Sequence, residues 1–321
     1  MSDLIRVENL KKYFRTSSGM LHAVDNVSFT IRTGGTLGVV GESGCGKSTL
    51  GRTILGLTEA TGGKVFFDGQ DVTHVSVRER KKLRRNMQII FQDPFSSLNP
   101  RMCVADLIAD PLRAYRVYRT KNELYDRVFE LMDTVGLARR FAFSYPHELD
   151  GGRRQRIGVA RALALEPKFI VCDEPVSALD VSIQAQILNL LQDLQEQQGL
   201  TYMFITHDLS VVKHISDEIM VMYVGCMVEK CAARELFQRP LHPYTLGLLG
   251  SVPRVETGRE RLKNIPGTVP TLYDVPKGCR FAERCSRATA RCKASMPPLV
   301  DAGEGHLVRC FLTGKEAADH E

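Results

Sequence analysis

The chain has 321 residues, of which 43% are hydrophobic and 25% are charged, and its formal net charge is +6. This composition is typical of a soluble globular protein of roughly two domains. No apolar run reaches the roughly 18 residues of a membrane-spanning helix, and residues 1–6 lack the apolar core of a signal peptide. The modest positive charge permits contact with phosphates or anionic lipids, but we expect no nucleic-acid partner.

Residues 4–34 predict an antiparallel β-layer, because apolar and polar residues alternate roughly in 4–8 and clearly in 23–31. Two neighbouring aromatic residues, Tyr13 and Phe14, follow the first of these stretches. One of them either stacks on a purine base or belongs to the core. The pattern alone favours neither interpretation.

Residues 41–48 have the pattern G-x-x-x-x-G-K-S of a phosphate-binding loop, between an apolar strand at 37–40 and a helix at 49–57. Glycines let backbone N–H groups turn inward around phosphates, and the helix start adds partial positive charge. We expect Lys47 to reach the β- and γ-phosphates and Ser48 to bind Mg²⁺. A glycine-rich turn that matches by chance is the alternative, which the flanking strand and helix disfavour. The candidate nucleotide-binding residues here are Gly41, Glu42, Ser43, Gly44, Cys45, Gly46, Lys47, Ser48 and Thr49.

Residues 63–91 predict a strand, a turn at Asp68-Gly69, a basic helix with a solvated face at 78–85, and a further strand at 87–91. This last strand ends at Gln92. Parallel sheets bind ligands at the carboxyl ends of their strands. Gln92 is therefore a candidate for holding Mg²⁺ or a water molecule, although one glutamine is a weak signal by itself.

Residues 104–164 predict mainly helices, with Gly136 as a C-cap. A further helix, which runs to residue 165, begins near Asp150-Gly151-Gly152. Two glycines at a helix start expose backbone donors, which suits a second phosphate site.

The apolar residues 169–172 predict a buried strand that ends at Asp173 and Glu174. We expect Asp173 to bind Mg²⁺ through water and Glu174 to act as the general base. A solvated acidic turn is the alternative, and the phosphate-binding loop upstream disfavours it. An amphipathic helix to residue 198 and a strand at 202–205 precede His207, which we expect to contact the γ-phosphate. A lone histidine is more often structural, so this expectation rests on its neighbours.

Taken together, residues 4–235 closely resemble the ATPase subunits of ABC transporters. The segments that carry the resemblance are the phosphate-binding loop (Walker A), Gln92 (Q-loop), 149–156 (signature), Asp173-Glu174 (Walker B), 177–180 (D-loop) and His207 (H-loop). The resemblance implies an α/β P-loop NTPase fold with an antiparallel β-layer and a helical subdomain at about 95–165. It also implies a head-to-tail dimer that holds ATP between one subunit's Walker A and the other's signature, with Tyr13 stacked on adenine.

A closer resemblance is to the dipeptide/oligopeptide permease ATPases. Residues 91–101 resemble their Q-loop segment, 239–245 their C-terminal entry motif, and 46–52 the F-type subunit. This implies an ABC ATPase domain at 1–238 and a C-terminal extension at 239–321. It further implies a paralogous D-type ATPase partner, two transmembrane permease subunits and an extracytoplasmic peptide-binding protein. The chain would lie peripherally on the cytoplasmic face of the cell membrane and power peptide import, with nickel or sugar as alternative cargo.

The signature departs from the family pattern Leu-Ser-Gly-Gly-Gln, because Asp150 replaces the serine and Arg153 the glutamine. An ionised carboxylate cannot donate a hydrogen bond to phosphate and repels it. Three outcomes are open: Asp150 caps the helix and points away, a nearby arginine offsets its charge, or one ATP site of the dimer is degenerate. We expect some asymmetry between the two sites.

Four of the nine cysteines, Cys279, Cys285, Cys292 and Cys310, lie in an irregular Pro- and Gly-rich region after residue 250. Without a secretion signal, thiols favour metal or cluster ligation over a disulfide framework. Four thiolates suit Zn²⁺ or a [4Fe–4S] cluster, and the spacing does not decide between them. The permease resemblance implies a [4Fe–4S] cluster in a small cysteine-rich domain, with zinc, free thiols or disulfides as alternatives. We interpret the other five cysteines as packing residues.

Three classes of function compete. The first is an ATPase in which water attacks the γ-phosphate in line, Lys47 and Mg²⁺ stabilise the charge, Glu174 activates the water, and Gln92 and His207 sense the phosphate. The second is a soluble ABC ATPase of translation or DNA repair, which the single phosphate-binding loop and the absence of heptads disfavour. The third is a module that binds ATP without hydrolysis, which Asp150 keeps open.

Overall fold

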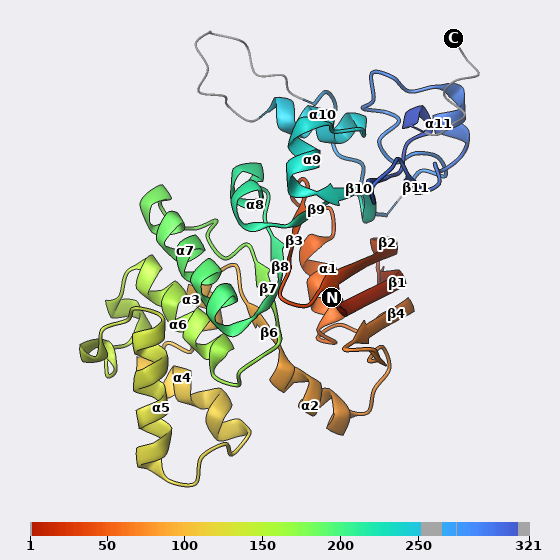
Figure 1. Cartoon of the computed structure of the whole chain (residues 1–321). Coiled ribbons are helices and arrows are strands. Elements are labelled where there is room, and N and C mark those ends of the chain that lie inside the picture. Colours follow the sequence, from red (N-terminus) through yellow and green to blue (C-terminus); the bar gives the residue numbers. More distant parts are fainter. Residues whose placement is uncertain (1, 252–264, 274, 314–321) are drawn as a thin grey trace. The chain divides into compact units, whose positions relative to one another are not determined.

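A computed structural model describes residues 2–251, 265–273 and 275–313. Its residues divide into two compact units, one of 1–74 with 204–321 and one of 75–203, and we describe each unit by itself. Figure 1 shows that both units combine helices with strands.

The first unit contains the antiparallel layer that the sequence predicts. Strands β1 (Asp3–Thr16) and β2 (Gly19–Arg32) pair with Tyr13 opposite His22, and β4 (Gly62–Phe67) and β5 (Gln70–Asp71) complete the order β2-β1-β4-β5. The predicted turn between β4 and β5 is confirmed, since Asp68 and Gly69 both have positive φ angles of 50° and 79°.

A second sheet in this unit has the strand order β11-β12-β10-β9-β3-β8. The bounds of its strands are β11 Val300–Asp301, β12 Leu307–Val308, β10 Cys226–Ala232, β9 Glu218–Tyr223, β3 Thr36–Val40 and β8 Thr201–Ile205, and the unit boundary falls inside β8. All five residues of β3 are buried, as is usual for a parallel strand covered on both faces. The helices of this unit are α1 Lys47–Ile54, α8 Leu209–Ile215, α9 Ala233–Gln238, α10 Pro243–Gly250 and α11 Ala290–Ala294.

The second unit continues from β8 with the order β8-β7-β6, in which β7 (Phe169–Asp173) and β6 (Met87–Ile90) are parallel. Its helices are α2 Val77–Asn86, α3 Pro94–Ser97, α4 Val104–Ala114, α5 Lys121–Thr134, α6 Gly151–Leu163 and α7 Val181–Gln198 (Figure 1). The predicted basic helix is α2, which has no buried residue and therefore presents a solvated face. Helix α7 buries the four residues that its amphipathic pattern indicates, Ile187, Leu188, Leu191 and Leu194.

The described residues of the C-terminal region are not separated from the rest of the first unit. They belong to the compact unit that also holds the N-terminal layer, and β12 pairs with β10 through Val308 and Glu229. The prediction of a separate cysteine-rich domain is therefore not supported, because these residues pack on strands from earlier in the chain. The boundary at 238/239 stays a prediction. Residues 252–264, 274 and 314–321 of the predicted C-terminal extension lie outside the described residues.

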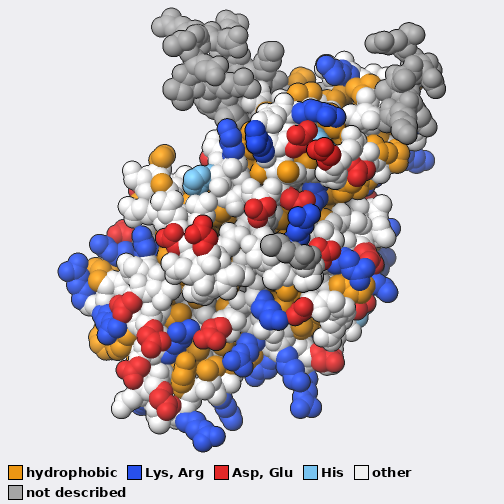
Figure 2. Space-filling view, viewed as in Figure 1, with side chains coloured by type: hydrophobic (Ala, Val, Ile, Leu, Met, Phe, Trp, Pro, Cys, Tyr) orange, Lys and Arg blue, Asp and Glu red, His pale blue; other side chains and the backbone are white. Residues whose placement is uncertain are grey.

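The surface carries charge of both signs. On the face that Figure 2 shows, Lys and Arg side chains alternate with Asp and Glu, and hydrophobic side chains lie between them in small groups. Among the helices that the structure describes, none has the length and apolar character needed to cross a bilayer.

A buried histidine gives this fold a pH dependence. His242 is 1% exposed and caps α10, since its Nδ1 accepts a hydrogen bond of 3.1 Å from the N–H of Tyr244. Burial lowers the pKa of His242 from 6.5 to about 4, against a smaller opposing effect of Glu229. Because the folded-state pKa is depressed, the neutral imidazole contributes stability above pH 6.5, and this contribution is lost as the pH falls towards 4.

The variant His242→Asn keeps a capping oxygen but does not titrate. We therefore expect its free energy of unfolding to vary less with pH between 6.5 and about 4. Between those two pH values the wild type should lose about 3 kcal/mol more free energy of unfolding than the variant. Urea denaturation of both proteins across this range measures the difference. Parallel curves would contradict the assignment.

Candidate functional site

The phosphate-binding loop joins β3 to α1 in the first unit, as the sequence predicts. Two of its glycines are required by close backbone contacts. A Cβ on Gly41 would lie 2.2 Å from the carbonyl oxygen of Met222, and one on Gly46 would lie 2.0 Å from that of Ala23. Both also have positive φ angles, 152° and 103°. Only glycine lets the loop wrap this tightly against β2 and β9.

Lys47 is the first residue of α1 and is 4% exposed. Its Nζ donates hydrogen bonds to the carbonyl oxygens of Gly41 (2.8 Å) and Glu42 (3.0 Å). These bonds fix the ammonium against the first turn of the loop. Ser48 follows at the second helical position, in the first turn of α1, and is half-buried.

Glu42 has partners that the sequence does not reveal. Its carboxylate forms a two-pronged ion pair with the guanidinium of Arg284, with distances of 2.7 and 3.0 Å. The N–H of Glu42 donates to the hydroxyl of Tyr244 at 2.9 Å. Both partners come from the C-terminal region, more than two hundred residues away in the sequence, and no local pattern marks them.

Tyr13 is half-buried on β1 and its hydroxyl donates to Asp25 at 2.5 Å. Its ring lies against that of His22, with centroids 4.2 Å apart. Burial, and then the hydrogen bond to Asp25, raise the pKa of Tyr13. Neither Tyr13 nor Phe14, which is 36% exposed, is a fully buried core residue, so the core interpretation of this pair is not borne out. The contact with adenine stays a prediction.

His207 follows β8 and is exposed. The N–H of its neighbour Thr206 donates to the carbonyl of Val39 at 3.1 Å. The backbone before His207 therefore joins the end of the strand that leads into the phosphate-binding loop.

The second unit brings together Gln92, Asp173 and Glu174. Strands β6 and β7 run parallel with Ile90 opposite Cys172, so their carboxyl ends meet at one edge. The amide of Gln92 donates to the carboxylate of Glu174 at 2.9 Å. Asp173 is 1% exposed, and Glu174 adopts a φ of 48°, which is rare for a residue with a side chain. The buried Asp173 is therefore not part of a solvated turn, and the catalytic role of the pair stays a prediction.

Known families match two parts of the chain, and known proteins match nearly all of it. Residues 24–177 match the ABC transporter family, and residues 228–292 match the oligopeptide/dipeptide transporter C-terminal region. The oligopeptide transport ATP-binding protein AppF of Bacillus subtilis is 49% identical in an alignment of 321 positions that covers 96% of this chain and 97% of AppF. OppF of Salmonella typhimurium is 48% identical, covering 96% of this chain and 95% of OppF. The chain belongs to the dipeptide/oligopeptide permease family of ABC-transporter ATP-binding subunits.

The fold agrees with this membership. The dimeric ATP-binding cassette MJ0796, in a post-hydrolysis state bound to ADP and phosphate, superposes with a TM-score of 0.66 at 31% identity. The match covers 72% of this chain and 99% of MJ0796. Like its family, the chain is an ATPase. Lys47, Ser48, Tyr13 and His207 lie in its first unit, and Gln92, Asp150, Asp173 and Glu174 in its second.

The family's signature position, Asp150, caps helix α6. One carboxylate oxygen accepts from the N–H of Arg153 at 2.8 Å and the other pairs with the Arg153 side chain at 2.7 Å. Asp150 is therefore the N-cap of α6, and its exposed pair with Arg153 offsets part of its charge. The degeneracy of one ATP site of the dimer stays a prediction. The second glycine after Asp150 has a packing reason as well, because a Cβ on Gly152 would lie 2.7 Å from the Ile183 side chain of α7.

Serine caps helices as well as aspartate does, so Asp150→Ser changes the charge while keeping the helix start. We expect the variant to raise ATP turnover of the assembled transporter, because a hydroxyl donates to phosphate whereas a carboxylate repels it. Steady-state ATPase measurements on the complex test this. Unchanged or lower turnover would show that Arg153 already cancels the charge.

All four C-terminal cysteines line one cavity in the first unit, together with His242 and Phe281. The cavity volume is about 10 Å³, roughly that of one water molecule. Burial, with the neighbouring thiols adding to it, raises the pKa of Cys310 to about 11. None of the nine cysteines, which all lie in described residues, forms a disulfide. In the part of the chain that the structure describes, no three His, Cys, Asp or Glu side chains are arranged to hold a metal ion.

Proposed function

We propose that this chain hydrolyses ATP to power the uptake of di- and oligopeptides. The proposal rests on the presence, in one chain, of an intact phosphate-binding loop and of the Gln92–Glu174 contact. The chain is also about half identical to oligopeptide transport ATP-binding proteins. Import of another small solute, such as nickel or a sugar, is the alternative.

The residues present suit the chemistry. The Ser48 hydroxyl, the Gln92 amide and the Asp173 carboxylate are the hard oxygen donors that Mg²⁺ prefers, and the ion would neutralise phosphate charge. Lys47 would bind the β- and γ-phosphates, Glu174 would accept a proton from the attacking water, and His207 would contact the γ-phosphate. Tyr13 would stack on adenine. The loop N–H groups of residues 41–49 would surround the phosphates.

For its partners, we propose a D-type paralogue in a head-to-tail dimer, with the Asp150-Gly151-Gly152 helix start facing the partner's ATP. Two transmembrane permease subunits and an extracytoplasmic peptide-binding protein would complete the transporter, with this chain peripheral on the cytoplasmic face. The names of the relatives, which are oligopeptide transport subunits, support this assembly.

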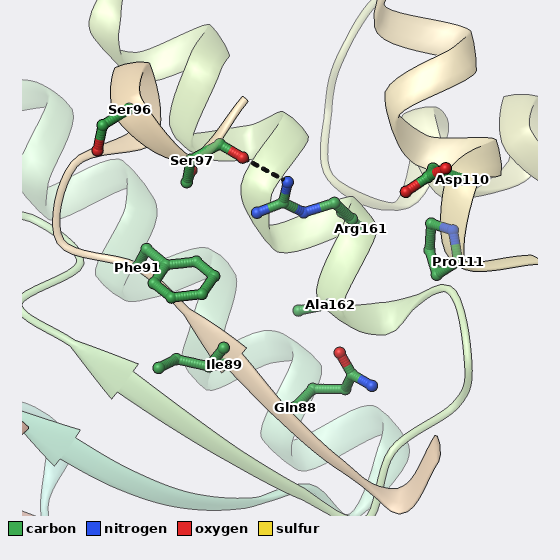
Figure 3. A pocket seen from close by; sticks show the side chains of 9 residues that line it. All are labelled: Gln88, Ile89, Phe91, Ser96, Ser97, Asp110, Pro111, Arg161 and Ala162. Carbon is green, nitrogen blue, oxygen red and sulfur yellow. Dashed lines mark hydrogen bonds between the residues drawn. The ribbon is translucent and has the colours of Figure 1, made fainter. Parts of the chain in front are cut away.

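A groove of about 530 Å³ in the second unit suits the permease contact (Figure 3). Phe91 lines one side, and Arg161, whose guanidinium donates to the carbonyl of Ser97 at 2.7 Å, lies across from it near Asp110. Burial lowers the pKa of Arg161. Phe91 is adjacent to Gln92, so a permease segment seated here would lie one residue from the amide that touches Glu174.

We also propose that Cys279, Cys285, Cys292 and Cys310 hold a [4Fe–4S] cluster. Four buried or half-buried thiols on one cavity provide the soft donor set that such a cluster requires. When bound, it would cross-link helix α11, which holds Cys292, to three irregular positions. The cavity of about 10 Å³ is smaller than a cluster, so the cysteines would have to move outward on loading. Zinc is the alternative occupant.

One preparation tests these points. The transporter is purified without oxygen from cells that carry a photo-crosslinking residue at Ser96, or at Lys82 of α2 as a control. We expect permease subunits to copurify and to crosslink from Ser96 only, and iron and acid-labile sulfide to be present at about four atoms per chain. If no permease subunit copurifies with this chain, the proposed role in an importer is contradicted. Zinc, or no metal, would contradict the cluster. A comparison of the uptake of labelled tripeptide, nickel and sugars by these cells identifies the cargo.

A further inference from the structure

Two buried arginines of the segment 279–285, Arg280 and Arg284, contact residues of the predicted nucleotide site. Arg284 is 5% exposed at its side chain and grips the carboxylate of Glu42 with two nitrogens, at 2.7 and 3.0 Å. Glu42 is the second residue of the phosphate-binding loop. Such two-pronged pairs fix orientation as well as charge.

Arg284 is itself held on its other side. Its Nε donates to the carbonyl of Pro266 at 2.9 Å, and one terminal nitrogen donates to the hydroxyl of Tyr223 at 3.3 Å. At the far end of this chain of contacts, the carbonyl of Glu42 accepts the hydrogen bond from Lys47. A continuous series of polar contacts therefore connects the C-terminal region to the lysine that binds phosphate.

The charge of Glu42 explains why such a contact matters. A carboxylate that stands within a loop for a polyphosphate repels that ligand at short range. The Glu42 side chain is only 27% exposed, so water does not fully screen it. Arg284 neutralises the charge, and its two-pronged grip holds the carboxylate in one place.

Arg280 makes a corresponding contact with Asp25, the residue that accepts the hydroxyl of Tyr13. Its guanidinium donates to the carboxylate of Asp25 and to the carbonyl of Val224. The other oxygen of the same carboxylate accepts the hydroxyl of Tyr13. Burial alone would raise the pKa of Asp25, but the bond from Tyr13 and the charge of Arg280 outweigh it and lower that pKa. The carboxylate therefore stays ionised and holds both partners.

We infer that the segment 279–285 is a positioning element of the nucleotide site, in which Arg284 sets the phosphate-binding loop and Arg280 sets Tyr13. The part about Arg280 rests on the proposed contact between Tyr13 and adenine. Cys279 and Cys285 are the first and last residues of the segment, so a group that holds these two thiols in place also restrains the two arginines between them. The inference itself does not depend on which group they bind.

The two arginines have different expected signatures in nucleotide binding by the full-length chain. We expect Arg284→Met to raise the Kd of both ATP and inorganic tripolyphosphate about tenfold, because it leaves a carboxylate unpaired beside the phosphates. The double variant Glu42→Gln with Arg284→Met should restore both values to within about twofold, since no uncompensated charge remains. Calorimetric titration with each ligand measures this.

Arg280→Met should raise the Kd of ATP about tenfold as well but leave that of tripolyphosphate unchanged, because only the base contact is disturbed. Tyr13→Ala provides the benchmark for losing that contact. If Tyr13→Ala does not change the Kd of ATP, the proposed adenine contact fails and the Arg280 part fails with it. If Tyr13→Ala weakens ATP binding and Arg280→Met does not, the inference about Arg280 alone is overturned.

Arg309→Met is the matched control for a purely structural role. Arg309 is also buried, at 9% exposed, but among the residues that the structure describes its guanidinium donates only to the backbone carbonyls of Met227 and Pro297. We expect it to lower the Tm without moving either Kd. The inference about Arg284 is overturned if Arg284→Met changes the Kd of tripolyphosphate no more than Arg309→Met does, or if the double variant does not restore it. Should Arg284→Met not fold, Glu42→Gln decides, because a tripolyphosphate Kd above that of the wild type would contradict the charge argument.

Discussion

Glu174→Gln is expected to lower ATP turnover of the transporter by about 10²- to 10⁴-fold while ATP still binds. Glutamine has the shape of glutamate but cannot accept a proton from the attacking water. Its carbonyl oxygen can still accept the hydrogen bond of 2.9 Å that Gln92 donates to the carboxylate. The loss should therefore fall on kcat, with little change in KM.

The backbone around Glu174 supports this expectation. Its φ of 48° holds the side chain in a conformation that residues other than glycine rarely adopt. Its carbonyl accepts hydrogen bonds from both the N–H and the hydroxyl of Ser177, at 3.3 and 3.1 Å. The D-loop thus fixes the residue that would act as base.

Glu166→Gln is a suitable control, because Glu166 has a similar φ of 52° in the same unit. Its carboxylate pairs with Arg127 at 3.0 Å and is 73% exposed, away from the two strand ends. We expect this control to keep wild-type turnover. A Glu174→Gln variant that turns over ATP at more than about a tenth of the wild-type rate would show that another group is the base.

Lys47→Ala should abolish nucleotide-dependent activity by a different route, with the loss appearing already in binding. The change removes the charge expected to meet the phosphates, for which we expect a loss of about 10²-fold or more in kcat/KM. It also removes the hydrogen bonds that Lys47 donates to the carbonyls of Gly41 and Glu42, of which only the second also accepts from the N–H of Cys45, at a cost of about 1–3 kcal/mol of stability. Titration with ATP, together with the Tm, separates the two effects.

Lys230→Ala is the control for that stability cost. Lys230 lies in the same unit, its side chain is 8% exposed, and it pairs with Glu218 at 2.6 Å. This variant should lose a comparable amount of stability but retain its affinity for ATP. If Lys47→Ala binds ATP like Lys230→Ala, the loop does not bind phosphate through this lysine.

The segments that carry chemistry were predictable because each is local. The phosphate-binding loop, the strand before Asp173 and the helix start at Asp150 are short stretches whose residue types dictate their own backbone. The structure confirms β3, β7 and β8 as fully buried strands. Even so, the sequence did not settle where the Asp150 carboxylate points, because its partner Arg153 is one of several nearby arginines.

The sequence alone determined the family and the strand-loop-helix order, and it predicted which residues bind phosphate and activate water. Only the tertiary structure decided that Arg284 grips Glu42 across 242 positions and Arg280 grips Asp25 across 255, and that four cysteines line one cavity. The reason is that hydrophobic periodicity and turn residues specify elements within a few residues, whereas ion pairs between distant segments depend on how the elements pack. Neither arginine lies in a pattern that indicates its partner.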